Sequence, residues 1–143
     1  MKELTVTFTV DDEDADLLTS YYAELRVRKG KKFIKLSKAI SERMGISGDV
    51  IDHINTVETD NTRKNLRAAS YSQNLQNSNK RSDNTSGYKG VSWYKRRNKW
   101  QVKLCLNNKQ IHLGLFDNVM DAALAYDKKA VELFGEYALT NFK

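Results

Sequence analysis

The chain has 143 residues, of which 40% are hydrophobic and 29% charged, and a net charge of +6, a balance that indicates a soluble globular protein and excludes a large multidomain enzyme. No segment approaches the ~20 consecutive apolar residues of a membrane span, and the acidic N-terminal stretch lacks the apolar core of a signal peptide. The single cysteine, Cys105, excludes an internal disulfide and a four-cysteine zinc site. We therefore expect no membrane contact, no zinc and a reducing, cytoplasmic location.

The positive charge lies in the C-terminal half. Residues 1–77 carry 12 Lys and Arg against 12 Asp and Glu, whereas residues 78–143 carry 12 against 6. The stretch from Lys80 to Lys109 holds nine basic residues and one acidic residue, Asp83. This concentration favours a polyanionic partner such as nucleic acid, with a solvated charged face as the open alternative.

The N-terminal part of the chain predicts a strand, a helix, a hairpin and a second helix, in that order. Residues 4–10 alternate apolar side chains with Thr, which predicts a half-buried strand. The acidic run from Asp11 to Asp16 predicts the start of a helix rather than a metal site, because carboxylates are favoured in a first helical turn. Residues 26–28 and 33–36 predict a hairpin that turns at Gly30, and residues 36–44 have helical spacing with Gly45 as the stop.

Residues 75–86 are the predicted domain boundary, since they contain one apolar side chain and many turn formers. Beyond them, residues 90–94, 99–104 and 109–113 alternate at period two and predict a three-stranded antiparallel sheet. Asp117 and Asn118 can cap a last helix, in which small residues form an apolar stripe up to Gly135.

A cluster of polar residues in positions 52–77 has the composition of a metal-assisted hydrolytic site. Asp52 lies beside His53 at the end of a β-prone run, and amide side chains follow at Asn61, Asn65 and Asn74. A neutral imidazole can remove a proton from water near pH 7, while carboxylate and amide oxygens suit a hard divalent cation.

These residues resemble the motif of the HNH endonucleases of the homing type. The matching pieces are Asp52-His53-Ile54-Asn55, Asp60-Asn61-Thr62-Arg63-Lys64-Asn65-Leu66-Arg67 and Gln73-Asn74-Leu75-Gln76-Asn77. The resemblance implies a ββα-metal nuclease module in which His53 is the general base and Asn65 orients its ring. It implies Asp52 and Asn74 as ligands of one divalent cation, Mg²⁺ with Mn²⁺ as a substitute, and Asn61 and Asn77 as structural support.

Two departures from that motif bear on activity. The family commonly has Gly-Asn after D-H-I-N, whereas this chain has Thr56-Val57. Many members carry a further histidine upstream, where this chain has Ser37-Lys38. The four central residues, Asp52, His53, Asn65 and Asn74, are intact, so we expect an active nuclease. The two departures can reduce its activity.

Residues 86–142 resemble the AP2/ERF-type DNA-binding domain. The matching pieces include Ser86-Gly87-Tyr88-Lys89-Gly90-Val91, Lys99-Trp100, Leu113-Gly114-Leu115-Phe116 and Phe134-Gly135-Glu136-Tyr137-Ala138-Leu139-Thr140-Asn141-Phe142. The resemblance implies a sheet that lies in the major groove with the helix packed behind it. Alternation places Trp100, Val102, Leu104, Ile111 and Leu113 toward the helix. The expected DNA contacts are Lys80, Arg81, Lys89, Ser92, Tyr94, Arg96, Arg97, Gln101, Lys103, Gln110 and His112.

The predicted fold class is α+β, with a nuclease domain over residues 1–77, a basic polar linker over 78–86 and an AP2-like domain over 87–143. We expect a metal-dependent endonuclease that hydrolyses phosphodiester bonds in double-stranded DNA. The resemblance implies a phage, bacterial or mobile-element source. The main alternative is an AP2-type DNA-binding regulator with an inactive nuclease half, and a metal-dependent RNase or structure-specific nuclease is a third hypothesis. The sequence does not determine the DNA target, whether one or both strands are cut, or whether the protein forms a homodimer.

Overall fold

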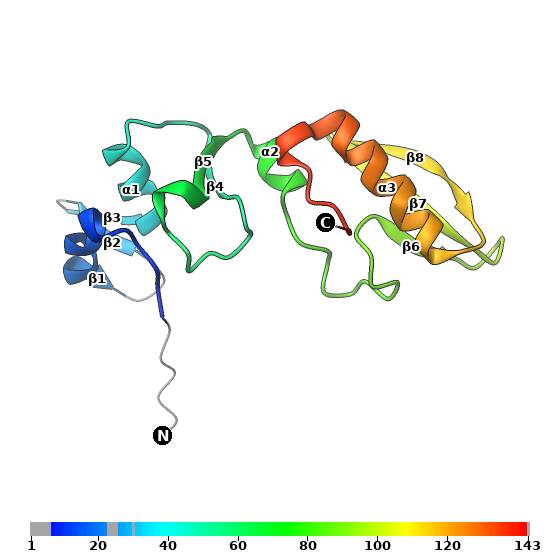
Figure 1. The fold of residues 1–143 in the computed structure, drawn as a ribbon, viewed down its shortest axis with the longest axis horizontal. Helices are drawn as coiled ribbons and strands as arrows, with labels where there is room; N and C mark the ends of the chain where they lie inside the picture. The colour runs from blue at the N-terminus through cyan, green and yellow to red at the C-terminus, as the bar shows by residue number, and fades with distance from the viewer. Residues whose placement is uncertain (1–6, 23–25, 30, 143) are drawn as a thin grey trace, which may run out of the picture. The chain divides into compact units, whose positions relative to one another are not determined.

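The computed structural model describes residues 7–22, 26–29 and 31–142, in two compact units, residues 1–71 and 72–143 (Figure 1). The division falls after Tyr71, earlier than the boundary expected after residue 77. No helix in the described ranges is long and apolar enough to cross a membrane.

The first unit begins with a 3₁₀ helix, η1 (Asp12–Ser20), where an ordinary helix start was expected. Asp14 N–H donates to Asp11 O at 2.9 Å, the shorter spacing of a 3₁₀ turn. The acidic run serves as an ion-pair cluster: the fully buried Asp14 carboxylate accepts from Arg63 Nε at 2.7 Å and from Arg43 Nη1 at 3.3 Å. These partners hold the pKa of Asp14 below its usual value, the Arg63 hydrogen bond first.

The expected strand over residues 4–10 is not present in the part that the structure describes. Residues 4–6 lie outside the described residues, and Thr9 forms only an isolated parallel bridge with Asp60. Thr9 N–H donates to Thr59 O at 2.9 Å, and Asn61 N–H donates to Thr9 O at 2.7 Å. This segment therefore braces the polar loop that precedes Asn61.

The predicted hairpin and helix of the first unit are present. β1 (Tyr21–Tyr22), β2 (Arg26–Lys29) and β3 (Lys32–Lys35) form one antiparallel sheet, and the expected turn residue Gly30 lies outside the described residues. α1 (Leu36–Arg43) follows, with Gly45 at φ +71°. Leu36, Ala39, Ile40 and Leu66 form a buried apolar cluster in the described part of this unit.

A second hairpin carries the candidate centre. β4 (Val50–His53) pairs antiparallel with β5 (Leu66–Ala69), and the short 3₁₀ helix η2 (Arg63–Asn65) leads into β5. α2 (Tyr71–Gln76) begins at the last residue of the first unit and continues in the second. The chain order is thus strand, strand, helix, but a ββα-metal module within one unit is not shown.

The second unit has the predicted sheet and helix. β6 (Val91–Tyr94), β7 (Lys99–Leu106) and β8 (Lys109–Phe116) form an antiparallel sheet in that order, with positive φ at Asn98, Asn107 and Asn108 in the turns. α3 (Val119–Phe134) packs along one face, and the 3₁₀ helix η3 (Gly135–Tyr137) follows (Figure 1). The Asn118 side chain caps α3 by accepting from Met120 N–H at 2.7 Å.

The core of the second unit confirms the predicted alternation. Val102 and Leu104 are buried against Ala122, Ala123 and Tyr126, and the predicted inward residues Trp100, Ile111 and Leu113 pack around them. Gly90 has φ +75°, and a Cβ there would overlap the Tyr126 ring. Small residues on α3 and at position 90 therefore let the helix lie close to the sheet.

Candidate nuclease centre and nucleic-acid interface

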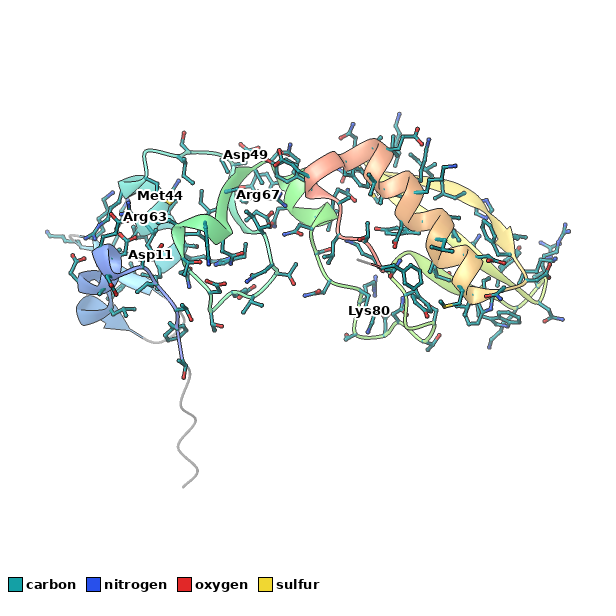
Figure 2. The ribbon with its side chains drawn as sticks, in the orientation of Figure 1. Asp11, Met44, Asp49, Arg63, Arg67 and Lys80 are labelled. Atoms are coloured by element: carbon teal, nitrogen blue, oxygen red, sulfur yellow. The ribbon has the colours of Figure 1, made fainter. Side chains whose placement is uncertain are left out.

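Asp52 and His53 are neighbours at the end of β4. The Asp52 side chain is buried, and its Oδ2 accepts from Arg67 Nε at 2.8 Å. Asp52 and Arg67 are directly opposite in the β4–β5 ladder, so register alone brings them together. Arg67, labelled in Figure 2, was not among the expected site residues, although its place in the Asn-Leu-Arg sequence could have indicated it.

His53 receives its ring contact from Asn61. The His53 Nε2 and Asn61 Oδ1 atoms are 3.1 Å apart, and Asn61 is almost completely buried. Asn61 Nδ2 donates to Glu58 O at 3.1 Å, which fixes the direction of the amide and turns its oxygen toward the ring. An amide oxygen only accepts, so this contact favours the tautomer with the proton on Nε2 and Nδ1 as the basic nitrogen.

Asn65 does not make the contact with His53 that was expected of it. Its Oδ1 accepts from Asn55 N–H at 3.0 Å, and its Nδ2 donates to Asn55 Oδ1 at 2.9 Å and to Asp60 O at 2.7 Å. Asn65 therefore closes the loop between β4 and η2. The orientation of the ring, which sequence analysis gave to Asn65, belongs to Asn61 because the Asn65 amide is engaged with the loop.

The departure at Thr56 has a structural counterpart. Thr56 has φ 63°, in the left-handed region that favours glycine and penalises β-branched residues. Thr56 N–H still donates to His53 O at 2.9 Å, which closes a turn directly after the histidine. The loop thus has a conformation that a glycine would adopt freely, with a threonine in its place.

The predicted metal ligands come from both units. Asp52 is buried in the first, whereas Asn74 is an exposed residue of α2 in the second, and Asn77 is buried directly after α2. Carboxylate and amide oxygens are hard donors that suit Mg²⁺. Among the described residues, no group of three or more His, Cys, Asp or Glu side chains could hold a metal ion. The metal set therefore stays a prediction that rests on donor chemistry.

The sheet face away from α3 carries the expected nucleic-acid contacts. Ser92, Lys103, Gln110 and His112 are exposed on the strands, and Tyr94 and Gln101 are partly buried. Arg96 and Arg97 are exposed in the turn between β6 and β7. Ser92 pairs with Gln101, and Lys103 with His112, which confirms that these four residues occupy ladder positions between the buried ones.

Part of this face borders a hollow of about 570 Å³ within the second unit. The residues that line it include five of the expected DNA contacts, Lys80, Arg81, Lys89, Ser92 and Lys103. Residues 78–86, expected as a linker, thus belong to the second unit (Lys80 in Figure 2). Asn84 Nδ2 donates to Tyr88 O at 2.8 Å and Ser86 Oγ to Val91 O at 2.8 Å, which attaches the segment.

Lys89 is engaged inside the second unit. Its Nζ donates to Gln76 O and, at 2.6 Å, to Ser78 O. Burial lowers the pKa of Lys89 to about 8. The expected direct contact between this amine and DNA is therefore not the role that the structure gives it. Gln76, which sequence analysis did not single out, donates from Nε2 to Cys105 O at 2.8 Å.

Comparison with known proteins gives two kinds of relative. Protein 3.8 of Escherichia phage T7 is 34% identical over 91 residues, which are 64% of this chain and 74% of that protein. The AP2-like ethylene-responsive transcription factor TOE2 of Arabidopsis thaliana is 41% identical over 58 residues, and APETALA2-like protein 2 of Oryza sativa subsp. indica is 40% identical over 58 residues. No protein-family profile matches the chain.

The plant matches are local. Each covers 41% of this chain but only 12% or 13% of the plant protein. The AP2/ERF motifs quoted above all lie in residues 86–142, so the AP2-like part of the chain is the second unit. The comparisons support this domain and give no support of their own to the nuclease motif.

Proposed function

The chain belongs to the same family as Protein 3.8 of Escherichia phage T7, and we propose that it binds double-stranded DNA through its AP2-like second unit. The observation that supports this proposal most is the exposed basic and polar face of β6, β7 and β8. Lys103 is exposed on this face and Arg96 and Arg97 are exposed in the turn between β6 and β7, while Val102 and Leu104 on the other face are buried under α3. Cations on a twisted antiparallel sheet can contact phosphates beside a groove.

The binding proposal is tested by fluorescence anisotropy with labelled duplex DNA, single-stranded DNA and RNA of the same mixed sequence. We expect the duplex to bind most tightly and log K to fall linearly with log salt concentration. The double variant Arg96→Met/Arg97→Met should reduce the slope by about two, since each phosphate contact contributes ~0.9. Lys128→Met, on the exposed side of α3, is the charge control. Preference for RNA, or equal slopes for both variants, would contradict the proposal.

Within this DNA-binding protein we propose, as a second step, that the first unit is a phosphodiesterase centre of the HNH type. The geometry that favours it is the row of Asp52, His53 and Asn61. The contact with Asn61 favours Nδ1 as the basic nitrogen, and the buried Asp52 carboxylate belongs to the preceding residue. The transcription-factor relatives favour the alternative, a DNA-binding regulator, so this step depends on the motif and on that geometry.

The chemistry of this step is a hydrolysis. Water oxygen forms a bond to phosphorus, the bond from phosphorus to the 3′ oxygen breaks, and the 3′ oxygen takes up a proton from solvent. His53 Nδ1 receives the proton of the attacking water, and Asn61 holds the protonated Nε2. A divalent cation such as Mg²⁺, with Asp52 as the residue of the first unit that would hold it, would stabilise negative charge on the phosphate.

Conversion of supercoiled plasmid tests the nuclease step. We expect nicked circles that need Mg²⁺ or Mn²⁺, that disappear with EDTA, and that are lost in His53→Ala. The His53→Ala variant should keep wild-type DNA affinity, which separates chemistry from binding. If the wild type binds the plasmid and leaves it intact, the nuclease step is wrong and the regulator hypothesis replaces it.

A further inference from the structure

The backbone of Lys89 is fixed to the core of the second unit. Its N–H donates to Asn141 Oδ1 at 2.6 Å, and its carbonyl accepts from Asn141 Nδ2 at 3.2 Å. Asn141 is held in turn by the buried Asp127 carboxylate, which accepts from Asn141 N–H at 2.7 Å and from Phe142 N–H at 2.8 Å. These hydrogen bonds hold the main chain at Lys89 in place, and with it the position from which the side chain extends.

The Lys89 amine links the core of the second unit to the segment that follows α2. Its two acceptors are the carbonyl of Gln76, the last residue of α2, and the carbonyl of Ser78 two residues later. Gln76 adds a second attachment through Cys105 O on β7, and Asn84 and Ser86 attach the far end of the segment. Residues 78–84 are thus held at both ends against the sheet.

The middle of this segment presents two exposed cations. Lys80 and Arg81 are exposed, and together with the exposed Lys103 of β7 they border the hollow described above. Arg81 pairs with Asp83, with Nε and Oδ1 2.9 Å apart, but that pair is itself exposed to solvent. An exposed ion pair contributes little, so a phosphate can replace Asp83 as the partner of Arg81.

We propose that Lys80, Arg81 and Lys103 form one surface for the sugar-phosphate backbone of duplex DNA, and that Lys89 is the positioning residue that holds this surface together. The inference rests on the proposed DNA-binding function and extends it to a segment outside the three strands. Lys89 fits an internal role because its amine is directed to two main-chain carbonyls rather than to solvent.

The two roles of Lys89 differ in their salt dependence. A direct phosphate contact would give Lys89→Met a loss of about one unit in the slope of log K against log salt, independent of Lys80 and Arg81. If Lys89 is instead a positioning residue, its replacement also removes the phosphate contacts of Lys80 and Arg81, so the slope falls by about two. The triple variant Lys80→Met/Arg81→Met/Lys89→Met should then bind no more weakly than Lys80→Met/Arg81→Met, a non-additive cycle.

The experiment measures duplex affinity by anisotropy at several salt concentrations for the full chain and these variants. Lys89→Arg, which can donate to both carbonyls, should restore most of the slope, and Lys128→Met serves as the charge control. Gln76→Ala removes the second attachment without removing a charge, so a smaller slope in this variant reports displaced cations. Gln76→Ala also decides the question if Lys89→Met does not fold.

The outcomes separate this inference from the function beneath it. Additive effects of Lys89→Met with Lys80→Met/Arg81→Met, or an unchanged slope in Gln76→Ala, would overturn the inference while DNA binding stands. A wild-type protein that does not bind duplex DNA would overturn both. A non-additive cycle with a reduced slope in Gln76→Ala supports the positioning role.

Discussion

Arg67 donates from Nε to Asp52 Oδ2 across 2.8 Å, in the ladder position directly opposite the carboxylate that is the expected metal ligand. Both side chains are largely buried, with 13% and 4% of their surface exposed. A guanidinium and a divalent cation both neutralise a carboxylate, so they compete for Asp52 if the nuclease proposal is right. This competition can be measured without any cleavage assay.

Replacing Arg67 by Met should strengthen metal binding and lower the stability of the metal-free protein. We expect roughly 10- to 100-fold tighter binding of Mn²⁺, because a charge-assisted hydrogen bond of ~1.5–3 kcal/mol no longer competes for the carboxylate. Without metal, loss of the arginine from a buried pair should cost about 3 kcal/mol of stability. Isothermal titration with Mn²⁺ and thermal unfolding in EDTA measure the two effects. Lys64→Met is the charge control, and unchanged or weaker Mn²⁺ binding would refute the competition.

Replacing Asn61 by Ala should remove the constraint on the His53 tautomer. We expect plasmid cleavage to fall by roughly 10- to 100-fold, as for other residues that orient a functional side chain through a hydrogen bond. The ¹⁵N shifts of the His53 ring give a direct readout, with the proton on Nε2 in the wild type and a mixture of tautomers in the variant. A wild-type ring protonated on Nδ1 would be incompatible with the proposed base.

Replacing Gly90 by Ala should destabilise the second unit by about 2–4 kcal/mol. The added methyl group would overlap the Tyr126 ring and carbonyl oxygen of Lys103 at a residue with φ +75°. Gly87→Ala is a matched control, since Gly87 has φ +82° and no atom within 4 Å of the added Cβ. Urea unfolding of the two variants separates overlap from backbone strain. Equal losses of stability would show that the close contact is not important.

Replacing Asp14 by Asn should destabilise the first unit at neutral pH and much less in acid. The pKa of Asp14 is lowered in the folded protein, so its ion pairs stabilise the fold above the unfolded-state pKa and this contribution is lost as pH falls through the folded-state value. We expect a difference of about 3 kcal/mol at pH 7 that shrinks below about pH 4. Urea unfolding across that range measures it, and a difference independent of pH would contradict the ion-pair role.

Local patterns were enough to predict the second unit. Period-two alternation placed Val102 and Leu104 inward, and the small residues Ala122 and Ala123 predicted a helix close to the sheet. The Asn118 cap also follows from the neighbouring sequence, since its partner is Met120. Each of these features depends on residues a few positions apart, which is why the sequence alone sufficed.

Long-range contacts explain what could not be predicted. Asp14 pairs with Arg63 and Lys89 with the carbonyl of Gln76, and neither partner can be identified without the tertiary fold. The expected linker became part of the second unit through contacts of this kind. In the candidate centre, the motif indicated the residues near His53, but only the tertiary structure shows that Asn61, rather than Asn65, contacts the ring.

The central claim is that the strand face away from α3 binds duplex DNA, and chemical-shift mapping tests it most directly. Titration of the ¹⁵N-labelled full chain with a mixed-sequence duplex should shift the amides of Ser92, Gln101 and Lys103 and those of the turn at Arg96 and Arg97. The amides along the exposed side of α3, at Leu124 and Lys128, should stay in place. Shifts confined to α3 or to the first unit, with the strand amides unchanged, would contradict the account.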